Sequence, residues 1–440
     1  MPSYIIRSMR KMFPQCLKLS YKDTAQQNSY VTIPRAANSF DNTEIAANVD
    51  EDIIDSLTGG RLVGSVTSFE NFAECPLRYY LRYGVDLKER EEFTFSPVNF
   101  GVVLHAVIRE VCDEIKKNGE SYYLISEEKR REMVKRSVSA ITDIYQNSIL
   151  KDSSRNSFMI KRMEDLADRT IWAMGEQLKC GDFVPFVFEH KFNMEVGDGD
   201  RKQLMSGTID RVDICENDTD VYVRIIDYKT GKKDFNIVKT YYGIDIQLMV
   251  YMEAAMKLVA KMRPGKNVLP AGVFYYNISD PIVSATNESA EEIEDKIKGE
   301  LRLKGMVNSD KDIAEKMDNT EGTSLNIPVS RKADGGFDSR RSKVMNTEQF
   351  NMLGRFVDVR AVDTADRIAG GDIRRSPYKD GQFSSCDRCP YGAVCGFSVD
   401  LPGCNYRKLK KFDDEVLWNN IKEGVDENGK KMDTGAEERD

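Results

Sequence analysis

The sequence predicts an α/β fold in which a mixed central sheet is flanked by helices. Apolar residues recur at helical spacing in much of the chain before residue 180, whereas β-branched and aromatic residues dominate residues 183–229. Apolar residues make up 40% and charged residues 31% of the 440 residues, which is the usual balance of a globular protein with a substantial core.

Helices are expected at four places before the strand-rich region. Thr67 and Glu70 stand three apart, as in a capping box, so a helix should begin there and run toward Cys75. A second helix is expected at 101–117, where apolar residues recur every three or four positions. Two further helices, rich in charged residues, should cover the core from outside at 127–148 and 158–179.

The expected strands follow these helices. Three of them come in succession, at 183–192, 203–215 and 221–229. After them we expect a helix at about 244–262, a fourth strand at 271–278 and a long helix at 346–369. This order of elements is typical of a sheet that is covered by helices.

The remaining segments set the expected domain boundaries. Residues 1–61 are weakly patterned, and the principal domain is expected to span 62–415. Within it, residues 305–345 are polar and contain glycine, which predicts an insertion with little core of its own. Residues 425–440 are mostly polar and are expected to form a disordered tail.

The composition excludes several classes of protein. The net charge of −8 argues against a generally basic protein that coats nucleic acid, although a local basic groove is enough to hold phosphates. No apolar run approaches the roughly 18 residues of a membrane helix, and the start of the chain shows no secretory signal. Nine cysteines, sparse and unevenly placed, suit a reducing compartment, so we expect a cytoplasmic protein without a membrane partner.

Two aspartates and a lysine form the central chemical pattern. Asp227 and Lys229 end an apolar strand, and side chains at i and i+2 point to the same face, about 7 Å apart. Asp210 lies on the preceding strand, and antiparallel pairing would bring it beside Asp227. Two converging carboxylates repel each other unless a cation such as Mg²⁺ or Mn²⁺ lies between them. A lysine beside the cation can orient an attacking water or offset charge on a phosphate, whereas a surface ion pair is the simpler alternative.

His105, Gln247 and Tyr251 can each be interpreted as ordinary structural residues or as residues of a site. His105 lies among apolar neighbours of the helix at 101–117, where a histidine is more often a core residue than a ligand. Gln247 and Tyr251 stand four apart, hence on one helical face, which in isolation favours a solvated surface.

The cysteines Cys386, Cys389 and Cys395 form a C-x2-C-x5-C motif, which indicates a metal site that needs a fourth ligand. If Cys404 is that ligand, the site is local and resembles a zinc ribbon. If Cys75 is the ligand, a [4Fe–4S] cluster could join two distant segments. The spacing does not decide between zinc and iron–sulfur.

The ordered set of motifs resembles the nuclease domain of the AddB family, which belongs to the AddAB ATP-dependent helicase/nucleases. The motifs are SVTSFENFAECPLRYYLRYGVDLKERE, GVVLHAVI, GTIDRVD, IIDYKTG, QLMVY and CDRCPYGAVCGF, within residues 62–415. RecB and CRISPR-associated exonucleases share parts of this pattern. The resemblance implies a PD-(D/E)xK (restriction-endonuclease-like) core that is closed by a [4Fe–4S] site.

The resemblance also implies roles for single residues. It makes Asp210, Asp227 and Lys229 catalytic, and gives the Mg²⁺ the ligands His105, Asp210 and Asp227. It places Gln247 and Tyr251 near the DNA. It makes four cysteines the cluster ligands, namely Cys75, Cys386, Cys389 and Cys395, and leaves Cys404 outside the site.

The implied function is a metal-dependent exonuclease that cuts single-stranded DNA from 5′ to 3′ beside an AddA-like subunit, in double-strand break repair by recombination. The alternative is a non-catalytic DNA-binding scaffold, stabilised by iron–sulfur or zinc, for a helicase partner. Residues 1–61 resemble only the tail of the helicase-like region of the family. No GxxxxGK[ST] motif is present, so we expect no ATP binding through that motif.

Overall fold

The computed structural model describes residue 49 and residues 63–88, 97–144, 154–196, 203–284, 288–401 and 404–437. The chain divides into two compact units. The larger unit is formed by Val63–Glu70, Glu92–Asp363 and Lys411–Asp440, and the smaller unit contains Asn71–Glu91 and Thr364–Lys410. Apart from Val49, the expected remnant at 1–61 lies outside the described residues.

The larger unit is built on a mixed sheet. Its strands run in the order β1-β3-β4-β5-β6-β7, and β2 pairs with β3. Antiparallel pairs join β2 to β3, β3 to β4 and β5 to β6, while the other pairs are parallel. The strand bounds are β1 (Val63–Ser65), β2 (Val184–Val196), β3 (Gln203–Glu216), β4 (Asp220–Lys229), β5 (Asn267–Asn277), β6 (Lys304–Asn308) and β7 (Val344–Met345). The predicted α/β class with a mixed sheet is therefore confirmed.

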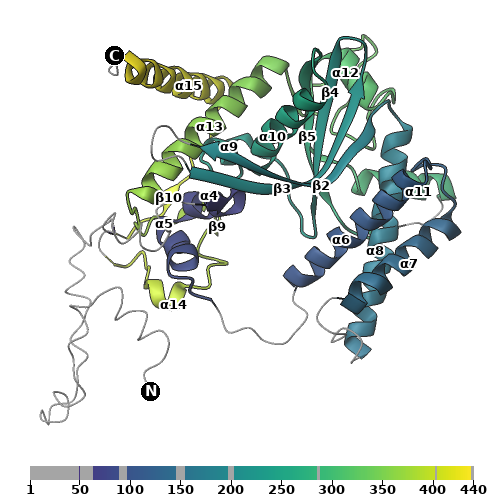
Figure 1. Ribbon diagram of the computed structural model, residues 1–440, viewed down its shortest axis with the longest axis horizontal. Helices are drawn as coiled ribbons and strands as arrows, with labels where there is room; N and C mark the ends of the chain where they lie inside the picture. Colours follow the sequence, from purple (N-terminus) through teal and green to yellow (C-terminus); the bar gives the residue numbers. More distant parts are fainter. Residues whose placement is uncertain are drawn as a thin grey trace, which may run out of the picture. The chain divides into compact units, whose positions relative to one another are not determined.

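Helices cover both faces of this sheet. The helices α6 (Pro97–Lys117), α7 (Glu127–Ile144) and α8 (Ser154–Lys179) lie together and share a core with Ile226 and Tyr228 of β4 (Figure 1). The alternate residues Val223 and Ile225 are buried too, and α10 (Gln247–Met262) contacts β4 and β5. Because β4 is buried on both sides, its sequence is a nearly continuous apolar run.

The other helices of this unit are short or lie late in the chain. They are α9 (Ile237–Tyr241), α11 (Ala290–Glu300), α12 (Lys311–Met317) and α15 (Asp414–Glu437). The helices α4 (Val66–Glu74) and α13 (Thr347–Ala369) begin in the larger unit and end in the smaller one.

The smaller unit contains the cysteine-rich segment. Its elements are α5 (Pro76–Tyr79), a π-helix (Tyr80–Gly84), β8 (Tyr378–Asp380), β9 (Phe383–Ser384), α14 (Gly392–Cys395) and β10 (Arg407–Lys408). The three strands form a small sheet in the order β10-β8-β9. Phe72, Tyr79 and Ile368 form its apolar cluster.

Three local expectations differ from the structure. Residues 305–345 are not without core, because β6 joins the sheet and Ile327 and Val329 are buried in the main core. The segment expected as a tail from residue 425 is helical as far as Glu437, since α15 continues through it. The helix α4 begins one residue early, and Ser65 Oγ, rather than Thr67, accepts a hydrogen bond from the backbone N–H of Ser68.

None of the helices in the described residues is long and apolar enough to cross a membrane.

Candidate active site

The two aspartates meet where β3 and β4 begin to separate. Arg211 pairs with Ile226, so Asp210 and Asp227 occupy the next positions along the antiparallel ladder. Asp210 Oδ2 accepts a hydrogen bond of 2.7 Å from the backbone N–H of Tyr228. Both aspartates are buried, with exposed fractions of 8% and 2%. The expected antiparallel pairing therefore brings these two carboxylates together.

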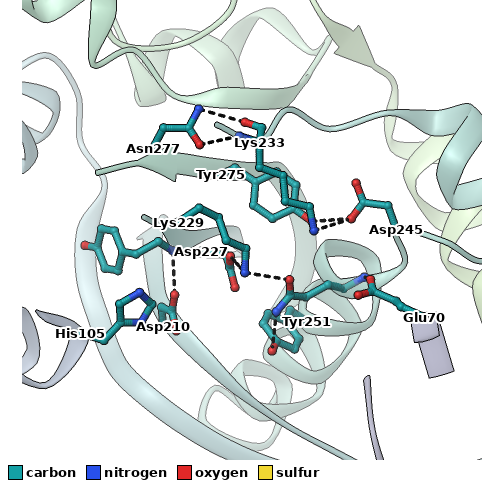
Figure 2. A network of polar contacts seen from close by, with 12 residues as sticks. Glu70, His105, Asp210, Asp227, Lys229, Lys233, Asp245, Tyr251, Tyr275 and Asn277 are labelled. Carbon is teal, nitrogen blue, oxygen red and sulfur yellow. Dashed lines mark hydrogen bonds and ion pairs between the residues drawn. The ribbon is translucent and has the colours of Figure 1, made fainter. Parts of the chain in front are cut away.

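Lys229 and α10 complete one side of the site (Figure 2). The Lys229 Nζ lies 2.5 Å from Asp227 Oδ2 and donates a hydrogen bond of 3.0 Å to Gln247 Oε1. Gln247 Nε2 in turn donates to the Tyr251 hydroxyl at 2.9 Å. Since Gln247 and Tyr251 lie one turn apart on α10, the helix face holds the lysine from the side opposite to Asp227.

The surroundings of Asp227 disfavour the negative charge of its carboxylate. Burial and the neighbouring Asp210 raise the pKa of Asp227 to about 7, although Lys229 acts in the opposite direction. Apart from its ion pair with Lys229, the buried Oδ2 of Asp227 accepts no hydrogen bond from the described residues. An oxygen atom in this state suits a hard divalent cation.

His105 lies at the carboxylates rather than in the apolar core. Its Nδ1 lies 3.5 Å from Asp210 Oδ1 and 3.7 Å from Glu189 Oε1. Ligand atoms of these three residues all lie within 4.8 Å of one another, so they could hold one metal ion. Burial would lower the pKa of His105, but the nearby carboxylates of Asp210 and Glu189 outweigh it and raise the pKa to about 10. A bound cation would take the place of the proton between these groups.

Glu189 is a site residue that sequence reasoning missed. It lies on β2 opposite Asp210, between the pairs Phe188–Arg211 and His190–Ile209. Its φ of 48° is in the left-handed region, which costs a residue with a side chain of the order of 1–3 kcal/mol. Strain of this kind persists where the surroundings enforce it, and here it accompanies a carboxylate that faces His105 and Asp210. The one signal in the sequence was an acidic residue within an apolar strand.

A second polar group lies beside Lys229 and was also missed. Lys233 Nζ lies 3.0 Å from Asp245 Oδ1, and the Tyr275 hydroxyl donates to the same oxygen at 2.6 Å (Figure 2). Glu70 accepts hydrogen bonds from the backbone N–H groups of Ile246 and Gln247. Burial raises the pKa of Glu70 to about 7, and Lys233 opposes this rise.

The smaller unit holds the second candidate site. The four cysteines Cys75, Cys386, Cys389 and Cys395 line one cavity together with apolar neighbours such as Leu81 and Phe397. Cys404 is buried and does not line it. Burial raises the pKa of Cys395 to about 11, and nearby Cys75 and Cys389 contribute to the rise.

The geometry of these thiols bears on the size of any bound group. A tetrahedral zinc ion with Zn–S bonds of about 2.3 Å would hold its thiolates about 3.8 Å apart. Within the described ranges, no three cysteine sulfurs lie within 4.8 Å of one another.

Comparison with known proteins identifies the class. A model of the PD-(D/E)XK nuclease superfamily matches residues 64–396, so this chain belongs to that superfamily. More particularly, it is similar to the AddB-type subunits of ATP-dependent helicase/deoxyribonucleases. With that of Clostridium acetobutylicum it shares 35% identity over 383 residues, which are 85% of this chain and 33% of the relative. With that of Lachnoclostridium phytofermentans it shares 34% identity over 399 residues, which are 88% of this chain and 34% of the relative.

These relatives confirm the AddB resemblance that was drawn from the motifs. The chain spans about a third of their length.

Proposed function

We propose that this chain is the nuclease module of an AddAB-type helicase/nuclease, which hydrolyses phosphodiester bonds of single-stranded DNA with Mg²⁺ or Mn²⁺. The observation that carries the proposal is the meeting of Asp210, Asp227 and Lys229 at neighbouring strand positions, with His105 beside them. The similar proteins are named as deoxyribonuclease subunits, which supports DNA as the substrate.

The metal would be held by Asp210, Asp227 and His105, with Glu189 as a further ligand or as an acceptor for the imidazole. The carboxylates of Asp210 and Glu189 beside His105, together with the buried carboxylate of Asp227, support a hard cation at this place. Such a cation supplies Lewis-acid activation of the phosphodiester and a lower pKa for water.

Lys229 has the position of an electrostatic catalyst. Its ammonium group contacts both Asp227 and Gln247, which fixes its charge beside the carboxylates. A fixed positive charge of this kind stabilises the negative charge that grows on the phosphate in the transition state. Gln247 orients the lysine and Tyr251 orients Gln247.

An open groove beside Tyr251 supports binding of a single strand. It is lined by hydroxyl, amide and ammonium groups and by two aromatic rings, from residues that include Ser65, Thr67, Lys191, Asn193, Phe192 and Tyr251. Polar groups that can contact phosphates along a groove are one of the usual features of single-strand binding. Gly207 leaves room for these two rings, because a Cβ there would lie 2.6 Å from the Phe192 ring and 3.0 Å from the Tyr251 ring.

The cysteine cavity is the proposed [4Fe–4S] site. Four thiols that line one cavity suit a cluster in which each of four irons takes one thiolate. Cys75 lies 311 residues before Cys386 (386 − 75), so the cluster would join distant segments within the smaller unit. By closing a long loop, it would contribute to folding as well as to shape.

The domain bounds, the partner, the process and the direction of cutting are proposed from the resemblance to the AddB family. The module would comprise residues 62–415, and residues 1–61 would be the remnant of a helicase-like region. Its partner would be an AddA-like helicase subunit in the cytoplasm, with double-strand break repair as the process and 5′ to 3′ as the direction of cutting.

The test is digestion of single-stranded DNA by the purified chain, with and without Mg²⁺. One substrate carries a label at its 5′ end and a second carries it at its 3′ end, so the order of product release gives the direction. Mg²⁺-dependent digestion with early release of the 5′ label supports the proposal. Binding of the DNA without cutting in the presence of Mg²⁺ favours the non-catalytic scaffold instead.

A further inference from the structure

The helix that carries Gln247 and Tyr251 does not cap its own N-terminus. The residue before α10 is Ile246, which has no side-chain group to accept a hydrogen bond. The first N–H groups of any helix lack partners inside the helix, and leaving them buried without an acceptor is costly. In α10 the acceptor comes from another part of the chain.

That acceptor is the carboxylate of Glu70. Its Oε1 accepts from the backbone N–H of Ile246 at 2.9 Å and from that of Gln247 at 3.0 Å. Glu70 lies on α4, and Ile246 and Gln247 follow it in the sequence by 176 and 177 residues. A negative charge at a helix N-terminus is also stabilised by the helix dipole. Glu70, which the sequence suggested as part of a capping box for its own helix, thus caps a different one.

Gln247 connects this cap to the reacting groups. Its backbone N–H is held by Glu70, while its side chain accepts from Lys229 Nζ and donates to Tyr251. Lys229 in turn pairs with Asp227. Figure 2 draws Glu70, Lys229 and Asp227 in one network of polar contacts. A shift of the first turn of α10 would therefore move the amide that holds the catalytic ammonium group.

The other charged groups near Glu70 are already engaged. Lys233 pairs with Asp245 at 3.0 Å, and Asp245 also accepts from Tyr275. The backbone N–H groups of Ile246 and Gln247 donate to Glu70 and not to Asp245.

We propose that Glu70 is a positioning residue for DNA cleavage, which fixes the first turn of α10 and, through Gln247, the ammonium group of Lys229. This inference rests on the nuclease activity proposed above. Displacement of a reacting group by about 1 Å can reduce the rate by about 100-fold, so an effect on turnover is expected although Glu70 acts through backbone N–H groups of α10.

The experiment compares Glu70→Ala, Glu70→Gln and Gln247→Ala in the full chain, with Glu292→Ala as the matched control. Glu292 accepts from the backbone N–H of Ser289 in the capping box at the start of α11, so its loss removes a helix cap elsewhere. We expect Glu70→Ala to lower kcat by about 10- to 100-fold with little change in KM. Glu70→Gln keeps the oxygen that accepts both bonds and should recover most of the rate, and Glu292→Ala should match the unsubstituted chain.

A double variant and an exchange measurement make the test specific. If Glu70 acts through Gln247, Glu70→Ala with Gln247→Ala should be little slower than the slower single variant. Hydrogen exchange in metal-free protein should be faster at residues 246–251 in Glu70→Ala. Multiplicative losses in the double variant, or unchanged exchange at these residues, would overturn the inference. A chain that cuts no DNA at all would instead defeat the proposed function, and the exchange result would still show whether Glu70 holds α10.

Discussion

The two aspartates of the GTIDRVD motif should respond to substitution in opposite ways. Asp213 is fully buried and accepts hydrogen bonds from Arg211 at 2.7 and 2.6 Å and from Arg224 at 2.9 Å. Both arginines are buried as well, and Arg224 Nη2 has no acceptor among the described residues. Asp213 therefore pairs with two buried cations, a role that the sequence pattern does not separate from that of Asp210.

The cost of removing Asp213 follows from this geometry. Breaking one buried ion pair destabilises a protein by about 3–5 kcal/mol, because a buried charge is left without its partner. Asp213→Ala leaves two such charges, so we expect a loss of about 5 kcal/mol, a large part of the about 5–15 kcal/mol that holds a typical domain folded. Asp213→Asn keeps one acceptor oxygen and should lose about 3 kcal/mol.

Asp210→Asn is the control, because it changes the same charge on the same strand. Its amide oxygen can still accept from the Tyr228 N–H, and the repulsion between Asp210 and Asp227 is removed, so stability should change by less than about 1 kcal/mol. Urea unfolding followed by tryptophan fluorescence reports the larger unit, since Trp172 and Trp418 both belong to it. If Asp213→Asn unfolds at the urea concentration of the unsubstituted chain, or Asp210→Asn proves the less stable variant, the assignment of roles is wrong.

Three further outcomes are expected. Cys75→Ser should abolish the visible absorption of anaerobically purified protein and destabilise the smaller unit, whereas Cys404→Ser should leave both unchanged; a colourless protein with one zinc ion per chain would contradict this. Glu189→Gln should weaken Mn²⁺ binding by about 10- to 100-fold in a titration without DNA, and an unchanged affinity would remove Glu189 from the site. Chelation by EDTA should stop cleavage and added Mg²⁺ or Mn²⁺ should restore it, while cleavage that persists in excess EDTA would exclude the proposed metal site.

Local patterns predicted most elements of the larger unit. The strands around Asp210 and Asp227 were recognisable because their apolar runs are bounded by turn residues, and the i, i+2 spacing placed Asp227 with Lys229. The helical spacing of apolar residues located α6, which carries His105.

Residues that act across long sequence separations were not predictable in this way. Glu70 was assigned to its own helix because capping signals are local, whereas its partners lie 176 and 177 positions away. Glu189 depends on strand register and on a left-handed backbone, neither of which a single sequence displays. Tertiary contacts also made the polar segment 305–345 part of the core, against its composition.

The central claim is that Lys229, held by Asp227 and Gln247, acts in metal-dependent cleavage of DNA. The most direct measurement is the single-turnover rate of Mg²⁺-dependent cleavage of single-stranded DNA by Lys229→Ala. Lys266→Ala serves as a matched control, because Lys266 forms an ion pair of 3.0 Å with exposed Glu216 and lies outside the site. We expect Lys229→Ala to lose at least about 100-fold in rate and Lys266→Ala to cut normally, with both variants folded. Cleavage by Lys229→Ala at the rate of the unsubstituted chain would contradict the account.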